Sequence, residues 1–224
     1  MKPTFLFSTI AVLLLASGDG NAQKPLAPLP PVREEKPAAG AVAAIAPPEV
    51  VASAVAAVAK LGDEVVLGRY QVAVDRMNPM WKERTAQRMG GMDELNKQLS
   101  GVAKQMVQQG ISMIYFKPQG QPRSFEVSPG KKVEKVNGVD VENLVFNKWL
   151  VFVPTATKFR IMRQGETKPL VIDSIGFQVA ISDKGKNDWT FIDGSGLSVN
   201  DLRSLFVTLP QDLTFPPLEK RESR

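Results

Sequence analysis

Apolar and polar positions change their spacing once along the chain, and the first part of the pattern predicts helices. Residues 49–67 are rich in alanine, and apolar residues further on recur at steps of three and four. The most regular segment carries Asp93 and Glu94 in its first turn, and Gly110 follows in the position where a glycine commonly ends a helix. The expected helices cover residues 49–67, 69–77, 80–89 and 92–109.

After Gly110 the apolar period changes to two, which is typical of strands. Ser198, with Asp201 three positions later, predicts the cap of a short final helix that ends near Phe206. Helices followed by an antiparallel sheet predict an α+β fold. The expected strands cover residues 111–116, 144–162, 170–181 and 189–193, with turn signals at 129–130 and 137–138.

The stretch SDKGKNDWTFIDG, residues 182–194, comes close to the aspartate box of sialidase-type propellers. Its tryptophan stands one residue too far from the glycine, and the sequence lacks the repeats that propeller blades require. A hairpin with a three-residue loop explains the stretch better, because it places Phe177 opposite Asp193. A similar loop places Phe159 opposite Val171, so that three strands share one apolar face. We expect the helix over 92–109 to cover that face.

Two carboxylates fall on the predicted apolar face, and a buried carboxylate needs partners or a raised pKa. Asp173 is expected opposite Thr157 and near Thr155, while Asp193 lies level with Phe177. Each has a structural alternative: Asp173 bonds to Thr157, and Asp193 holds the loop that follows it. Their predicted separation is roughly 13 Å. Paired glycosidase carboxylates lie roughly 5 to 9.5 Å apart, so the spacing argues against a two-carboxylate hydrolase.

Two further groups of side chains are candidates for binding. Lys148, Lys158 and Arg160 have even numbers, and with Arg163 nearby they form a basic outer face for an anionic partner or an ordinary solvated surface. Trp81 in the second short helix either stacks on a ligand or fills the core.

The composition narrows the chemistry. The chain has no cysteine and no histidine, which excludes disulfides, thiolate nucleophiles and histidine-dependent hydrolases. We therefore predict neither a metal nor a cofactor. The formal charge of +5 weakly favours acidic partners.

The N-terminal residues predict an exported protein. A lysine precedes an apolar run too short to span a bilayer, and small residues end at Ala22, where cleavage is expected. We assign residues 1–22 to a signal peptide, 23–48 to a proline- and alanine-rich linker, 49–217 to the domain and 218–224 to a disordered tail. The expected location is outside the cytoplasm, in the periplasm, without a membrane span in the mature chain.

Several stretches resemble small secreted domains of the nuclear transport factor 2-like superfamily. They are GRYQVAVDRMNP (68–79), MGGMDELNKQL (89–99), VQQGI (107–111), DWTFIDGSGL (188–197) and LRSLFVTLP (202–210). The resemblance implies an α+β cone, in which a curved antiparallel sheet wraps around a helix and leaves a pocket open at one end. It also admits a sheet-mediated homodimer. The linker and the alanine-rich helix depart from the pattern.

The leading functional hypothesis is a secreted, non-catalytic binding or interaction module. Its partner would be an envelope protein, an anionic polymer or a small apolar molecule, and nucleic acid is not expected. The alternative is a small-molecule isomerase or lyase in which Asp173 is the base and Tyr70 or Tyr115 donates the proton.

Overall fold

The computed structural model describes residues 45–222, except for 129–130, 137–138 and 163–166. The predicted signal peptide and nearly all of the linker, together with Arg163, therefore lie outside the described residues. Among the described helices, none is long and apolar enough to cross a membrane.

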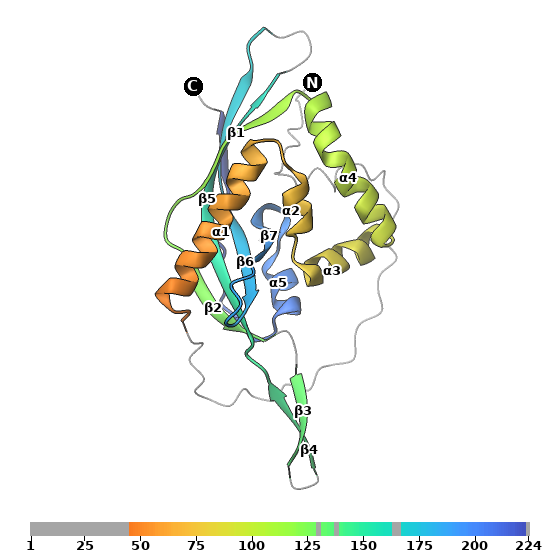
Figure 1. Ribbon diagram of the computed structural model, residues 1–224, viewed down its shortest axis with the longest axis vertical. Coiled ribbons are helices and arrows are strands. Elements are labelled where there is room, and N and C mark those ends of the chain that lie inside the picture. The colour runs from red at the N-terminus through yellow and green to blue at the C-terminus, as the bar shows by residue number, and fades with distance from the viewer. Residues whose placement is uncertain (1–44, 129–130, 137–138, 163–166, 223–224) are drawn as a thin grey trace.

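The helices form where the sequence predicts them (Figure 1). They are α1 Pro48–Val66, α2 Gln71–Asp75, α3 Pro79–Met89, α4 Met92–Gln108 and α5 Val199–Leu205. Gly110 has a positive φ of 64° just after α4, which confirms its role in ending that helix. Ser198 and Asp201 form a complete capping box at the start of α5.

One antiparallel sheet forms the centre of the molecule. Its long inner strands are β5 Lys148–Ile161 and β6 Leu170–Asp183. The outer edge of β5 pairs with β1 Ile111–Pro118 and with β2 Arg123–Val127. The outer edge of β6 pairs with β7 Thr190–Asp193 and with β8 Glu219–Glu222. A separate hairpin of β3 Lys131–Val136 and β4 Val139–Leu144 projects from one end of the molecule (Figure 1). The α+β class is confirmed.

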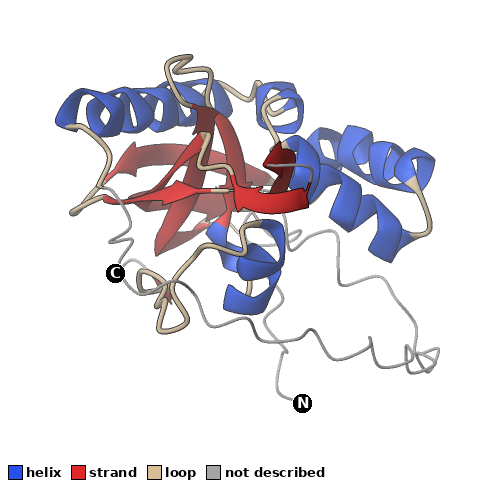
Figure 2. Ribbon diagram, turned by 90° about the horizontal axis from the view of Figure 1, so that it is seen from below, coloured by secondary structure: helices blue, strands red, loops and turns tan. Residues whose placement is uncertain are grey.

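Helices lie on both sides of this sheet (Figure 2). On one side, which we call the α1 face, residues of α1 such as Val58 and Leu61 pack with Val151, Phe159 and Phe191 of the strands. On the other side, the α5 face, α5 and the segment after it cover one half of the sheet. The buried residues of that cluster include Leu150, Phe152, Val179, Ile192, Leu202 and Phe206.

Burial on both faces explains why the predicted register is wrong by one residue. Phe159 pairs with Ile172 instead of Val171, and Asp193 pairs with Gln178 instead of Phe177. The loop before β7 is longer than expected and includes Asn187 in the left-handed region, with a φ of 52°. Because alternate residues of β5 and β6 are buried on opposite faces, their odd or even numbering does not fix the pairing.

Two other expectations differ from the structure. The helix that covers the sheet is mainly α1, whereas α4 packs chiefly against α3 and reaches the α1-face cluster only through residues such as Val102 and Met106. Residues 219–222, expected to be disordered, form β8, a strand whose side chains are all exposed. Its sequence, EKRE, has no apolar alternation, so only pairing with β6 identifies it.

Candidate functional site

A polar band interrupts the apolar α1 face at the middle of the sheet. On β5, Thr155 and Thr157 separate the apolar residues at each end of the strand. On β6, Ser174 pairs with Thr157, Gly176 pairs with Thr155, and Gln178 follows. The four polar residues are between 3% and 8% exposed, so this band is part of the interior and not of the solvated surface. Buried polar groups of this kind usually have a partner, which makes the band the first place to look for a ligand.

A pocket of about 320 Å³ lies over this band. Its volume is near the lower end of the range for small-molecule sites. Because Gly176 has no side chain, part of the pocket floor is open there. The remaining wall is formed by Phe116, Ile175, Phe177, Asp193, Ser195, Leu218, Glu219 and Lys220.

Asp193 is held in place at one side of the pocket. One carboxylate oxygen accepts a hydrogen bond from Gln178 Nε2 at 3.0 Å. The other accepts hydrogen bonds from the backbone nitrogen of Ser195, at 2.8 Å, and from the Ser195 hydroxyl. These bonds begin the short 3-10 helix Gly194–Gly196, as expected for an aspartate that holds its loop. Asp193 therefore combines a structural role with a position in the pocket wall.

Lys220 brings a positive charge to the same wall from β8. Partial burial lowers the pKa of Lys220, while the negative charge of Asp193 opposes that change. The residue as a whole is exposed, which places it at the rim and not on the floor. The pocket thus joins a carboxylate and an ammonium across a floor of hydroxyls.

The hydroxyls of Thr155, Thr157 and Ser174 have no hydrogen-bond partner within the described part of the chain. Each hydroxyl can both donate and accept. Among the described residues, the buried side-chain atoms without a hydrogen-bond partner are Arg84 Nε and Arg203 Nε, so these three oxygens reach the open space of the pocket, where a bound molecule or water can pair with them. The floor is therefore built to receive a polar molecule.

The candidates from the sequence divide between two faces. Thr155, Thr157 and Asp193 line the pocket on the α1 face, whereas Phe177 borders it but packs within the α5-face cluster. Asp173, in contrast, lies on the α5 face opposite Lys158, with 3.1 Å between its Oδ1 and Lys158 Nζ. The expected contact with Thr157 is wrong, because the shift of one residue moves Asp173 to the other side of the sheet.

The two tyrosines of the catalytic alternative do not share a site. Tyr115 and Asp173 line a shallow groove of about 520 Å³ on the α5 face. Tyr70 instead packs against the α1-face cluster at the start of α2, and burial raises the pKa of its hydroxyl. Of the two tyrosines, only Tyr115 therefore shares a groove with Asp173.

The predicted basic outer face is largely neutralised. Lys158 is paired with Asp173, and Lys148 is paired with Asp183. Hydrogen bonds from Lys148 and then from Lys186 lower the pKa of Asp183. Arg160 donates from Nε to the hydroxyl of Ser112 at 2.7 Å. These pairings favour the interpretation of an ordinary solvated surface.

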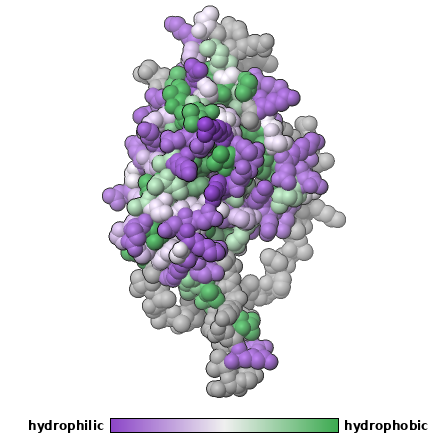
Figure 3. Space-filling view, viewed as in Figure 1, coloured by the Kyte–Doolittle hydropathy of each residue, from purple (hydrophilic) through white to green (hydrophobic). Residues whose placement is uncertain are grey.

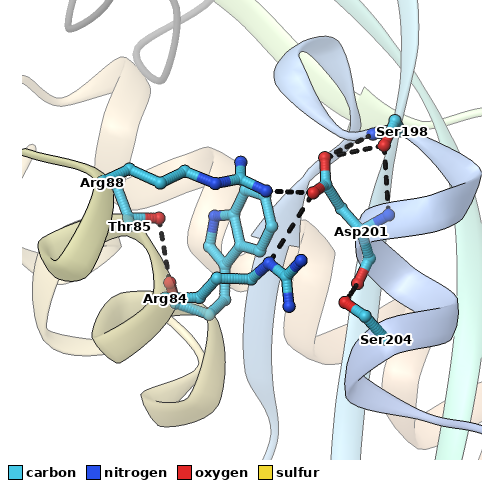
Figure 4. A network of polar contacts seen from close by, with 7 residues as sticks. Arg84, Thr85, Arg88, Ser198, Asp201 and Ser204 are labelled. Carbon is cyan, nitrogen blue, oxygen red and sulfur yellow. Dashed lines mark hydrogen bonds and ion pairs between the residues drawn. The ribbon is translucent and has the colours of Figure 1, made fainter. Parts of the chain in front are cut away.

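Trp81 belongs to a contact between helices and not to the pocket. It packs against the α5-face cluster, and the guanidinium carbon of Arg88 lies 5.7 Å from the centre of its ring. Arg88 donates to Asp201 of α5, and Arg84 Nε lies 3.6 Å from the same carboxylate (Figure 4). Burial alone would raise the pKa of Asp201, but hydrogen bonds from Ser198 and Arg88 outweigh it and lower the pKa. The network ties α3 to the cap of α5.

Ser174, Gln178 and Lys220 were not predicted from the sequence as pocket residues. Ser174 and Gln178 become neighbours of the threonines only in the observed pairing, and Lys220 arrives through β8. The sequence pattern that could have identified Ser174 and Gln178 is a polar interruption at equivalent points of two adjacent strands.

No family model matches the chain, and neither does any curated protein or solved structure. In the part of the chain that the structure describes, no cluster of carboxylates could hold a metal ion.

Proposed function

We propose that the protein is a secreted, non-catalytic binding module that holds a small polar molecule in the pocket on its α1 face. The observation that carries this proposal is the row of hydroxyls at Thr155, Thr157 and Ser174, which line the pocket and make no hydrogen bond to another described residue. A purely structural core would place apolar residues at these positions, because the neighbouring positions on the same face are apolar.

The export of the protein and a cone of the nuclear transport factor 2-like type remain parts of this proposal. The signal-like N-terminus supports export. A pocket on the face of the sheet that α1 partly covers is compatible with the cone that the resemblance implies. Hydrophobic side chains gather only in small patches among hydrophilic ones on the side shown in Figure 3, which favours a pocket over a broad apolar docking surface there.

Native mass spectrometry of the protein purified from the cells that produce it tests the proposal. We expect an added mass of a few hundred daltons that is absent from the Thr155→Val/Thr157→Val variant. Exposed Thr214 provides the matched control, since Thr214→Val makes the same change away from the pocket. A clean mass for the unmodified chain, or an added mass that survives in the double variant, would reject the proposal.

The isomerase or lyase alternative retains one supporting observation, the shared groove of Asp173 and Tyr115. The ion pair with Lys158 opposes it, because the carboxylate must give up a bound cation before it can accept a proton. If an added mass persists in the double threonine variant and is lost in Asp173→Asn, the groove on the α5 face becomes the site.

A further inference from the structure

We propose that the ligand of the α1-face pocket is a neutral sugar of one or two rings; this inference rests on the proposed binding function. The floor of the pocket carries several polar groups that a sugar can pair with. Three hydroxyls each offer a donor and an acceptor, and the Gln178 amide keeps a second N–H and a carbonyl oxygen after its bond to Asp193. A molecule that meets all of them must carry several closely spaced groups that both donate and accept. Sugar hydroxyls have this property.

Part of the pocket wall is apolar. Phe116, which is 6% exposed, borders the pocket next to Thr157, its partner in the sheet. Leu218 contributes further apolar surface. A sugar ring has one edge of hydroxyls and faces of C–H groups, so it can lie with its polar edge on the floor and a C–H face toward the apolar part of the wall. A wholly polar ion would leave this wall unused.

The charges at the α1-face pocket balance. Asp193 brings one carboxylate to the wall and Lys220 brings one ammonium, whereas Glu219 pairs with Ile175 and therefore lies on the side of the α5 face. A balanced pair favours a ligand without net charge. Asp193 Oδ2 accepts only one hydrogen bond, from Gln178, among the described residues, so it has a lone pair for a ligand hydroxyl. A charged rim that both donates and accepts fits a neutral polyhydroxyl ring.

An apolar ligand, which the sequence had left open, fits the floor poorly. It would cover the hydroxyls of Thr155, Thr157 and Ser174 without giving them partners, and each buried polar group without a partner lowers affinity. Because four polar side chains share this floor, affinity would be lowered at each of those that the ligand covers.

Saturation-transfer difference NMR tests the sugar directly. The neutral probes are D-glucose, D-galactose, D-mannose, N-acetyl-D-glucosamine and cellobiose, and D-glucuronate and benzoate represent anionic and apolar ligands. We expect signals from at least one neutral sugar, strongest for the protons on one C–H face. Thr155→Val/Thr157→Val should weaken that binding about tenfold or more, since each lost hydrogen bond lowers affinity by a factor of roughly two to ten. Thr214→Val should leave it unchanged.

A second variant fills the pocket instead of changing its chemistry. An added Cβ at Gly176 would lie 3.8 Å from Leu218 Cδ2 and from Thr155 Oγ1, which is ordinary contact, and valine suits a strand. Gly176→Val should therefore fold and lose the sugar signals. The inference is overturned if no neutral sugar binds, if binding survives both variants, or if benzoate or D-glucuronate binds more tightly.

The two proposals can fail separately. A pocket-dependent added mass that is not a carbohydrate would reject the sugar and keep the binding function. A clean native mass together with absent sugar signals would reject both.

Discussion

The approach of α1 to β1 leaves no room for a side chain at Gly62, and this makes a sharp prediction about Gly62→Ala. A Cβ added there would lie 2.5 Å from the backbone oxygen of Phe116 and would overlap the Phe116 ring. The ring can rotate, but the carbonyl is fixed by the sheet, so the helix must move away from β1. The α1–β1 contact is the most extensive between a helix and a strand in the described chain, and its disturbance should be costly.

The magnitude follows from two opposing effects. Alanine is favoured over glycine inside a helix by about 1 kcal/mol. Overpacking a well-packed core costs about 1–3 kcal/mol and occasionally more. Because the clash involves backbone, we take the upper part of that range and expect the free energy of unfolding to fall by about 2 kcal/mol. For a domain of this size that lowers Tm by about 4–8 °C.

Gly101 in α4 provides a matched control, because an added Cβ there meets nothing within 4 Å. Gly101→Ala should raise the free energy of unfolding by about 0.5–1 kcal/mol through helix propensity alone. Urea unfolding of both variants, followed by tryptophan fluorescence and by circular dichroism, gives the two values. The reasoning is refuted if the two substitutions change stability in the same direction, or if Gly62→Ala is neutral.

Three further predictions concern stability. Thr155→Val/Thr157→Val should change the free energy of unfolding by less than about 1 kcal/mol, because it replaces hydroxyls that bond to no other described residue with methyl groups of similar size; urea unfolding that shows a larger loss would contradict this. Asp201→Asn should lower the free energy of unfolding by about 1 kcal/mol at pH 7 through the weakened cap. Folding lowers the pKa of Asp201, so its carboxylate stabilises the fold at pH values above its ordinary pKa near 3.9. The difference in free energy of unfolding between Asp201→Asn and the unmodified chain should therefore narrow as pH falls through the folded pKa. A constant difference from pH 7 to pH 3 would be inconsistent with that. Ser53→Ala should lower stability by about 1 kcal/mol, because it removes the acceptor for Trp189 Nε1 at 3.0 Å, and an unchanged urea midpoint would show that the bond contributes nothing.

Local signals predicted the helices well because each acts within a few residues. The glycine after α4 and the Ser198–Asp201 capping box specify helix ends through their own backbone and side-chain bonds. Strands β1, β5, β6 and β7 were also predicted in place, whereas β2 and β8 were not. The register of β5 and β6 was not predicted, because Leu150 to Val153 on β5 and Phe177 to Ile181 on β6 are buried on both faces, which removes the odd–even signal.

The candidate site shows the same limit. Thr155, Thr157 and Asp193 were predicted, since polar residues stand out within apolar strands. Asp173 was assigned to the wrong face because the assignment depended on register. Lys220 could not be found, because a short, fully exposed strand such as β8 has no apolar pattern and pairs with β6 across a long stretch of chain.

The central claim is that the polar pocket on the α1 face holds a ligand. A crystal structure of the protein as purified from its own cells tests it most directly. The account predicts continuous electron density, larger than isolated waters, in contact with Thr155 or Thr157 and with Asp193. A pocket that contains only ordered waters, or one closed by side chains, would contradict it.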